Sequence, residues 1–311
     1  MQRLAALIMR GRVYAMLVAA TFGVISLLLP PLQPITTMLS GGVVALVALR
    51  LGALEGVFVM LGALVGVVAV AIPVLGNPAS ALVLVFIVWF PVFILALVLR
   101  QTRSLVLTLQ VAVLLGSAVV MAIYAIVPDP VAWWRNILTN MIQQSQLNKT
   151  GFEQMGRIMQ GVASRMTGVV ASALMLSALL GVVIGRWWQS LLYNPGGFGQ
   201  EFRALQLGNR VAYPSLVVLA VSLFASNSLA AIATDLLVAL VIIYAVQGLA
   251  IVHAIAFAVG RPLAWLMVLV YALLAILPPF VVVALAGMGF ADSWLNFRAY
   301  FDPKKPNVSD K

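Results

Sequence analysis

Four polar side chains in the second half of the chain could do ion or proton chemistry: Asp235, Gln247, His253 and Asn227. Their surroundings are almost entirely apolar. A carboxylate or an imidazole at membrane depth costs free energy unless it is paired or neutralised by a proton, so such groups are candidates for a substrate or ion site. On one helix, Gln247 and His253 would lie about 120° apart, so they do not form a single polar stripe.

Each of these residues also has a structural interpretation. Asp235 follows Thr234 between two apolar runs, and we expect it to cap a helix N-terminus, where a carboxylate satisfies free amides. If the helix begins earlier, Asp235 is buried and becomes the best proton or cation site in the chain. For His253 we expect a hydrogen bond to a hydroxyl or carbonyl, with a proton relay as the alternative. Asn227 could bond between helices or line a cavity.

A second pair of charged residues stands near the start of an apolar run. Glu55 follows Arg50 by five positions, and we expect the two to pair across a tight turn. Contact between Glu55 and a basic residue of a partner is the alternative.

The sequence offers little for catalysis or metal binding. It has no cysteine, one histidine, no paired carboxylates and no motif that joins a serine nucleophile to a base. We therefore expect no enzyme activity, no metal site and no cofactor.

The composition is that of a protein dissolved in lipid. Hydrophobic residues make up 64% of the 311 positions and charged residues only 8%, against roughly 25% charged residues in soluble domains. The net charge of +10 comes from single Arg and Lys residues at segment ends, which indicates membrane topology and argues against a nucleic-acid partner. The lipid bilayer is the expected partner.

The apolar runs predict an all-α, polytopic transmembrane helical bundle with about nine spans, since one crossing needs about 20 apolar residues. Eight is the alternative, because the second run is short enough to be re-entrant and Pro278 with Pro279 could kink or end the ninth. The expected spans are approximately Val13 to Leu29, Ile35 to Leu49, Ala53 to Leu75, Ala81 to Leu99, Leu105 to Val127, Met166 to Gly185, Tyr213 to Ala231, Leu236 to Val259 and Leu263 to Gly287.

Arginines in the short loops place the N-terminus in the cytoplasm, in a bacterial inner membrane. The loop before the sixth span then faces outward, and two apolar stripes at helical spacing predict an amphipathic helical hairpin there, either a lid on the membrane face or a partner-binding surface. The resulting segments are 1–127 with five helices, 128–165 with the amphipathic helices, 166–185 with the sixth helix, 186–212 as a cytoplasmic interfacial elbow, 213–290 with three helices, and 291–311 as an amphipathic tail.

The elbow contains the most individual stretch of the chain, RWWQSLLYNPGGFGQEFR from Arg186 to Arg203. We expect an interfacial anchor, then a turn, then a short surface helix. The anchor residues are Arg186, Trp187, Trp188 and Tyr193; the turn contains Pro195, Gly196 and Gly197; the helix carries Phe198 and Phe202. The stretch lacks the Lys and Ser/Thr of a phosphate-binding loop, so it predicts a joint or a docking surface and no active site.

Small residues four positions apart predict close helix packing, within the chain or against a partner. The pairs are Ala15 and Ala19, Gly62 and Gly66, and Gly181 and Gly185.

Three motifs together carry a resemblance over nearly the whole chain. The RWWQ-LLYNPGGF-EF pattern, the Gln247-Gly248-Leu249-Ala250 stretch and the terminal Asp292-Ser293-Trp294-Leu295-Asn296-Phe297-Arg298 segment resemble the YybS-like family of bacterial integral membrane proteins, which has no settled activity. More distantly, the first six helices resemble the S components of energy-coupling-factor vitamin transporters and the shape-determining protein MreD.

The S-component resemblance implies a substrate-binding subunit of a small-molecule transporter, with an ATPase or coupling subunit as partner and small residues of the first helix facing it. The MreD resemblance implies an envelope scaffold or assembly factor that binds other envelope proteins. An ion-coupled carrier based on Asp235 and His253 is a third possibility. A closed, polar-lined cavity among the first six helices would favour transport, and a solid bundle would favour the scaffold.

Overall fold

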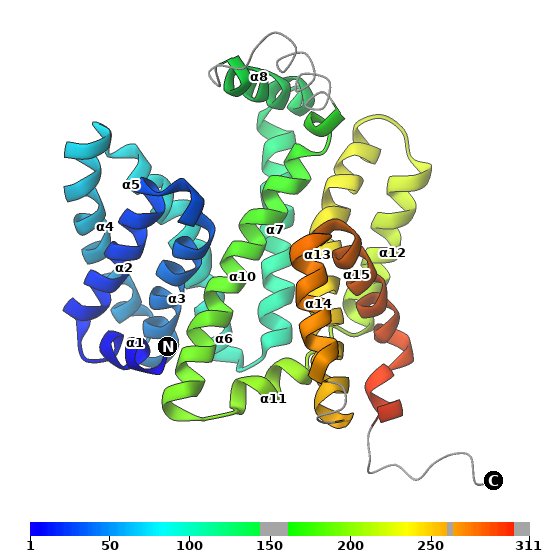
Figure 1. The fold of residues 1–311 in the computed structure, drawn as a ribbon. Coiled ribbons are helices and arrows are strands. Elements are labelled where there is room, and N and C mark those ends of the chain that lie inside the picture. Colours follow the sequence, from blue (N-terminus) through cyan, green and yellow to red (C-terminus); the bar gives the residue numbers. More distant parts are fainter. Residues whose placement is uncertain (144–160, 260–263, 302–311) are drawn as a thin grey trace. The chain divides into compact units, whose positions relative to one another are not determined.

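The computed structural model describes residues 1–143, 161–259 and 264–301, and all regular structure in these ranges is helical (Figure 1). Seven of the described helices are long and apolar enough to cross a membrane, so the chain has the architecture of a multi-pass membrane protein. These segments are Pro30–Leu51, Ala53–Val74, Ala81–Thr102, Leu105–Ile126, Met166–Tyr193, Asn227–Val259 and Pro278–Leu295. Three shorter apolar helices are Arg12–Leu28, Asn209–Phe224 and Trp265–Ile276.

The chain divides into two compact units. Unit 1 comprises residues 1–112 and 174–205, and unit 2 comprises residues 113–173 and 206–311. The helices α7 (Leu105–Ile126) and α10 (Met166–Tyr193) each contribute residues to both units. Residues 113–173 belong to the same unit as the last helices of the chain.

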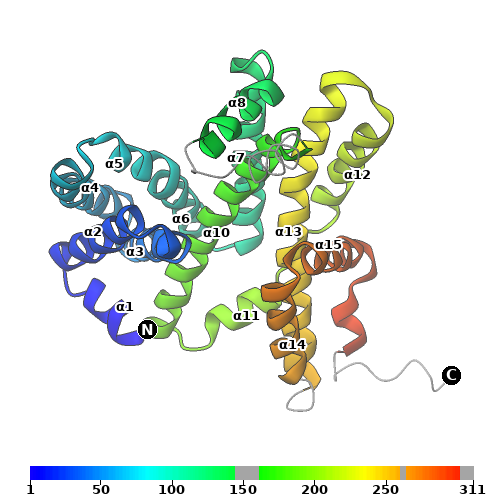
Figure 2. The same ribbon diagram turned by 45° about the horizontal axis from the view of Figure 1, so that its top comes forward.

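Unit 1 is built around α3, whose residues from Val43 to Ala48 are all buried. The helices α2 and α4 pack against α3 and against each other (Figures 1 and 2). The other described elements of unit 1 surround them. Its elements are α1 (Gln2–Ile8), α2 (Arg12–Leu28), η1 (Pro30–Leu32), α3 (Gln33–Leu51), α4 (Ala53–Leu75), α5 (Ala79–Val83), η2 (Leu84–Trp89), α6 (Phe90–Thr102), residues 105–112 of α7, residues 174–193 of α10, and α11 (Gly197–Arg203).

Small residues bring the helices of unit 1 together. A Cβ atom on Gly66 would lie 2.9 Å from Cβ of Ala20, and one on Gly185 would lie 2.6 Å from Cβ of Ala45, so α4 meets α2 and α10 meets α3 at these points. Gly62 meets the side chain of Met16 and Gly181 meets that of Val92. Ala15 and Ala19 are also buried inside unit 1, so they do not form a surface open to a coupling subunit.

A buried hydrogen-bond chain links three elements of unit 1. Trp89 Nε1 donates to Ser40 Oγ at 2.9 Å, and Ser40 Oγ donates to the Ala19 carbonyl at 2.8 Å. In an apolar medium these polar groups have no water to bond, so each is satisfied within the chain. The π-helical stretch η2 that carries Trp89 precedes Pro91, which cannot donate a backbone hydrogen bond.

Unit 2 is centred on the pairing of α13 with α15, which lie side by side in both views (Figures 1 and 2). Two glycines bring the backbones into contact: Gly248 meets the backbone of Leu285, and Gly289 meets the Tyr244 carbonyl. Besides its parts of α7 and α10, the elements of unit 2 are α8 (Pro130–Gln143), α12 (Asn209–Phe224), α13 (Asn227–Val259), α14 (Ala264–Ile276), α15 (Pro278–Leu295) and η4 (Phe297–Phe301).

Three expected spans in unit 2, the seventh, the eighth and the ninth, differ from the helices of the structure. The seventh was expected to continue to Ala231, but α12 ends at Phe224 and α13 begins at Asn227, well before Leu236. The ninth is two helices, α14 and α15, because Leu277 before the Pro278-Pro279 pair leaves helical geometry (φ −129°, ψ 52°).

The first of the two expected amphipathic helices is α8. Its buried residues Trp134 and Leu138 pack with Ala163, and Trp134 Nε1 donates to Thr167 Oγ1 at 2.9 Å. The second expected helix lies largely on residues 144–160, outside the described residues.

The contact of α13 with α15 predicts a selective effect of adding one methyl group. Gly248→Ala places a Cβ against the Leu285 backbone, which cannot rotate away, so we expect a loss of about 1–3 kcal/mol in stability. Gly287→Ala is the matched control in the same helix pair, since no atom lies within 4 Å of its Cβ position. Thermal unfolding of the full chain in detergent measures both, and equal melting temperatures for the two variants would contradict the described contact.

Candidate functional site

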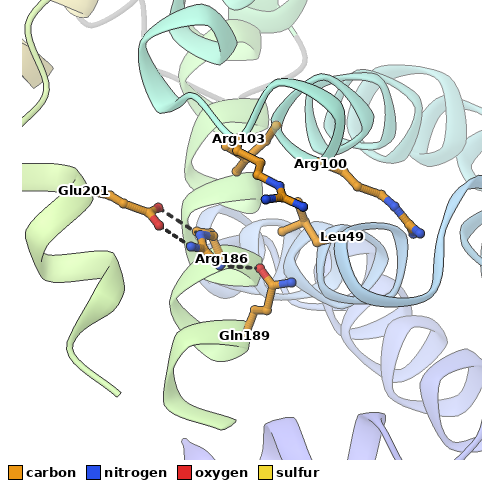
Figure 3. A pocket seen from close by; sticks show the side chains of 7 residues that line it. Leu49, Arg100, Arg103, Arg186, Gln189 and Glu201 are labelled. Atoms are coloured by element: carbon orange, nitrogen blue, oxygen red, sulfur yellow. Dashed lines mark hydrogen bonds and ion pairs between the residues drawn. The ribbon is translucent and has the colours of Figure 1, made fainter. Parts of the chain in front are cut away.

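A pocket of about 400 Å³ lies in unit 1 where the ends of α3 and α6 meet α10 and α11. It is lined by Leu49, Leu99, Arg100, Arg103, Arg186, Gln189 and Glu201. Figure 3 shows the pair of Arg186 and Glu201 at one side of this arginine pocket, and Arg100 and Arg103, from the end of α6, at the other. Three guanidinium groups and one carboxylate give the lining a formal charge of +2.

Arg186 is occupied by bonds within the protein. Its Nε donates to Glu201 Oε2 at 2.9 Å, a second guanidinium nitrogen pairs with the other oxygen of Glu201, and Nη1 donates to Gln189 Oε1 at 2.6 Å. This two-point ion pair joins α10 to α11 and fixes one wall of the pocket.

The guanidinium groups of the other two arginines form fewer hydrogen bonds than that of Arg186. Arg100 donates one hydrogen bond, from Nη1 to the Ala48 carbonyl at 3.0 Å, near the end of α3. Within the described residues, the side chain of Arg103 forms no hydrogen bond or ion pair. Its guanidinium is therefore the free donor of the arginine pocket.

Arg103 also has an unusual backbone. It ends α6 in the left-handed region with φ 53°, and its N–H donates to the Leu99 carbonyl at 2.8 Å. Glycine takes this position at helix ends with no side-chain penalty, whereas other residues adopt it at a cost of roughly 1 kcal/mol. Attraction of a cation to the helix C-terminus offsets part of this cost. An arginine at a place suited to glycine is typical of a functional position.

The turn after α10 positions Glu201. Ser190 Oγ donates to the Asn194 carbonyl at 2.7 Å and accepts from the Phe198 N–H at 3.1 Å, which ties both ends of the turn together. Gly196 has φ 85°, a conformation that favours glycine, and a side chain on Gly197 would collide with Asn194. The Pro195-Gly196-Gly197 sequence thus starts α11 where its carboxylate reaches Arg186.

Unit 2 contains a second polar cluster, around Gln247 and Asp292. Gln247 is fully buried; its Oε1 accepts from the Leu207 N–H at 2.9 Å, and its Nε2 donates to the Gly289 carbonyl at 2.8 Å and to Asp292 Oδ2 at 3.1 Å. Asp292 also accepts from the Phe297 N–H and from Arg298 Nη1, at 2.8 and 3.1 Å. These bonds occupy the Gln247 amide, so it joins helices and does not face a ligand.

The expectation that Asp235 caps a helix is wrong. The helix α13 begins at Asn227, eight positions earlier, so Asp235 lies about 12 Å along its axis and is buried, with 1% of its surface exposed. Tyr124 Oη of α7 donates to its Oδ2 at 2.8 Å. Its Oδ1 faces the backbone of Gly168 in α10, outside the geometry of an ordinary hydrogen bond.

The other ion candidates are not brought to Asp235. His253 is about 27 Å from it along α13, and its ring bonds the Leu249 carbonyl at 2.9 Å and Tyr271 Oη at 3.3 Å. Asn227 is exposed at the start of α13, with φ 60°. Asp235 and His253, the two residues named for an ion-coupled carrier, therefore do not adjoin along α13, and His253 has the carbonyl and hydroxyl partners of the structural interpretation.

The expected pair of Arg50 with Glu55 is also wrong. Glu55 accepts from Arg12 Nε at 2.6 Å and from a second nitrogen of the same guanidinium, although Arg12 is 43 positions away. The Arg50 guanidinium instead lies over the ring of Tyr193, 4.1 Å from its centre. Helix packing brings Arg12 to the start of α4, and the short turn at Gly52 does not bring Arg50 to Glu55.

The residues that were expected to anchor the elbow at the membrane interface differ in burial. Trp188 is fully buried against Gly42 in unit 1, so its expected place at an interface is wrong. Trp187 and Tyr193 are exposed. On α11, the rings of Phe198 and Phe202 stack with their centres 5.9 Å apart.

Sequence reasoning missed the arginine pocket. Arg100 and Arg103 were used only as topology signals, and Gln189 and Glu201 carried no expected role. The one available signal was the absence of an acidic residue near Arg100 and Arg103 in the sequence, which leaves two cations without a local partner.

Comparisons of the chain with protein-family models, curated proteins and solved structures find no match. The resemblance to the YybS-like family therefore stays a prediction. The structure itself defines the class of the protein, a multi-pass helical membrane protein with a cationic pocket. Among the described residues, no group of three or more His, Cys, Asp and Glu side chains could hold a metal ion.

The bonds of Gln247 predict that it is structural. Gln247→Leu leaves the Leu207 N–H and one side of Asp292 without a partner, so we expect a loss of roughly 1–3 kcal/mol in stability. Gln110→Leu is the control, because this half-buried glutamine forms no side-chain hydrogen bond within the described residues. Thermal unfolding in detergent separates the two; an unchanged or raised melting temperature for Gln247→Leu would instead favour a ligand role.

Proposed function

We propose that this multi-pass membrane protein lies in the bacterial inner membrane with its N-terminus in the cytoplasm. The support is the placement of arginines toward the same predicted face: Arg50 in the last turn of α3, Arg100 and Arg103 at the end of α6, and Arg186 in the C-terminal part of α10, seven positions before its end. Positive residues concentrate on the cytoplasmic side of membrane proteins. The arginine pocket then opens to the cytoplasm, and Arg186 to Arg203 is its interfacial elbow.

The split of the last expected span bears on the C-terminus. The helix α14 has 13 residues, about 20 Å, which is short for a hydrocarbon core of about 30 Å. If α14 crosses the membrane, α15 crosses it in the opposite direction; if α14 turns back inside the membrane, α15 leaves on the side where α14 entered. In both cases α15 ends on the side of the membrane on which α13 ends. With α13 ending in the cytoplasm, the C-terminal end of α15 lies in the cytoplasm as well.

We further propose that the protein is a binding subunit for a small anionic molecule, as part of a transport system. One observation carries this proposal: the exposed guanidinium of Arg103 has no partner among the residues that the structure describes, and it lies in a polar pocket whose lining has a net positive charge. Guanidinium groups donate in a planar fork that fits carboxylate and phosphate oxygens. The Arg186 and Glu201 pair fixes a wall, and Arg100 and Arg103 supply the charge that attracts the ligand.

The position of the pocket supports transport over a scaffold. It lies among α3, α6 and α10, which belong to the first six expected spans, and its polar lining suits a small solute, although the pocket is open at one face and is not the closed cavity that the sequence criterion asked for. An anionic lipid headgroup of the cytoplasmic leaflet offers the same chemistry as a soluble anion, since basic pockets between helices bind such headgroups. The two sources are separated by experiment.

We expect anions to stabilise the full chain in a nonionic detergent. A ligand that binds only the folded state raises its stability by RT ln(1 + [L]/Kd), so melting temperature should rise with added inorganic phosphate or citrate. Arg103→Gln should weaken this response about tenfold or more, because a hydrogen bond to a charged group contributes roughly 1.5–3 kcal/mol. Arg10→Gln is the matched control, removing one charge from an exposed site of unit 1 outside the pocket.

A second experiment, native mass spectrometry with phosphatidylglycerol and phosphatidylcholine, distinguishes an anionic lipid headgroup from a soluble anion as the ligand. Preferential retention of phosphatidylglycerol that Arg103→Gln abolishes, without a response to soluble anions, assigns the pocket to lipid and removes the transport proposal. Equal responses of both variants to every anion would remove the binding site itself. An envelope scaffold would then be favoured, and recovery of envelope proteins without an ATPase or coupling subunit on affinity purification would support it.

A further inference from the structure

The most unusual charged group in unit 2 is the carboxyl of Asp235. Among the residues of this unit that the structure describes, two aspartates are buried, and the partners that these residues offer them differ sharply. Asp292 accepts from Phe297 N–H, Gln247 Nε2 and a guanidinium, Arg298 Nη1. Asp235 accepts one ordinary hydrogen bond, from the neutral hydroxyl of Tyr124, at 2.8 Å. One carboxyl has its negative charge compensated, and the other does not.

The helices around Asp235 leave little room for water or a large ion. A Cβ atom on Gly168 would lie 2.7 Å from the Asp235 Cα and 2.9 Å from its Oδ1, so α10 and α13 touch at this point. The absence of a side chain at Gly168 is what admits the carboxyl between the helices.

The titratable groups of the neighbouring elements do not neutralise Asp235. From α7 the facing group is the Tyr124 phenol, and from the turn that precedes α10 it is Arg165, which is exposed and forms no ion pair with Asp235. On α12 the titratable residues are Arg210 and Tyr213, and both lie in the first turns of that helix. Asp235 lies in the first part of α13, near the opposite end of α12, so these two residues are far from it. No other charged residue belongs to α13.

An ionised carboxylate in this place would be expensive. In an apolar medium, a charge without a counter-ion is strongly disfavoured, and the group takes up a proton instead. A protonated carboxyl keeps the bond from Tyr124 on its carbonyl oxygen and needs no cation.

We propose that Asp235 is a proton-binding site, protonated at neutral pH and reached through the half-buried Tyr124 near the outer end of α7. Release transfers the proton from the carboxyl to water and leaves a carboxylate at the crossing of α10 and α13. That charge opposes the close contact at Gly168, so proton release is coupled to loosening of this crossing. The site is independent of anion binding at the arginine pocket, and it is the feature that an ion-coupled carrier would use.

Infrared spectroscopy of the full chain in phosphatidylcholine vesicles tests the proposal. A protonated carboxyl has a carbonyl stretch that a carboxylate lacks. At neutral pH we expect one such band, lost in Asp235→Asn, retained in Asp292→Asn, and shifted in Tyr124→Phe because its hydrogen bond is gone. The same band in wild type and Asp235→Asn, or its loss in Asp292→Asn, would overturn the proposal.

A second measurement needs no variant at Asp235. Dicyclohexylcarbodiimide is an apolar reagent that adds to protonated carboxyl groups, and peptide mass spectrometry locates the adduct. We expect labelling of Asp235 in the wild-type protein, decreasing as the pH is raised. Labelling of other carboxyl groups without labelling of Asp235 would overturn the proposal. Loss of the infrared band when sodium chloride is added at constant pH would also overturn it, because that result would show a cation site in place of a proton site.

Discussion

A polar side chain inside an apolar helix bundle has no water to bond, so it must find a partner within the chain, and this constraint organises most of the structure. Ser40 serves both Trp89 and the Ala19 carbonyl. Gln247 satisfies a loop amide, a helix carbonyl and a carboxylate at once. Such bonds are possible only because small residues let the backbones approach, as Gly248 and Gly289 do between α13 and α15.

The departures from this rule indicate function. Neutral groups such as Trp188 Nε1 and Ser172 Oγ also lack a partner among the described residues, but an unpaired neutral group costs far less than an unpaired charge. Two charged side chains stand out: Arg103, which is exposed to solvent at the arginine pocket and has no side-chain partner among the described residues, and Asp235, which is buried and has only the Tyr124 hydroxyl among them. One is suited to receive an anion and the other to hold a proton.

The sequence predicted the helices well because length and apolarity decide them locally. The expected span from Ala53 to Leu75 is α4, and that from Leu105 to Val127 is α7 within one residue. The helix start at Asn227 escaped prediction because the break after Phe224 contains no proline or glycine, and this error turned a buried Asp235 into an expected cap. A local boundary error thus became an error about chemistry.

The candidate site could not be predicted because its partners are distant in the sequence. Glu55 was matched with Arg50, five positions away, while the packing of α2 on α4 presents Arg12 from 43 positions away. The arginine pocket combines α3, α6, α10 and α11, and no spacing within one helix reveals it.

The most direct test of the account is an experimental structure of the full chain, determined by electron cryomicroscopy in lipid nanodiscs that contain phosphatidylglycerol, with phosphate in the buffer. The account predicts density for an anionic group within hydrogen-bond distance of the Arg103 guanidinium, in the pocket closed on one side by Arg186 and Glu201. A map in which Arg103 pairs with a carboxylate of the chain and the pocket holds only water would contradict it.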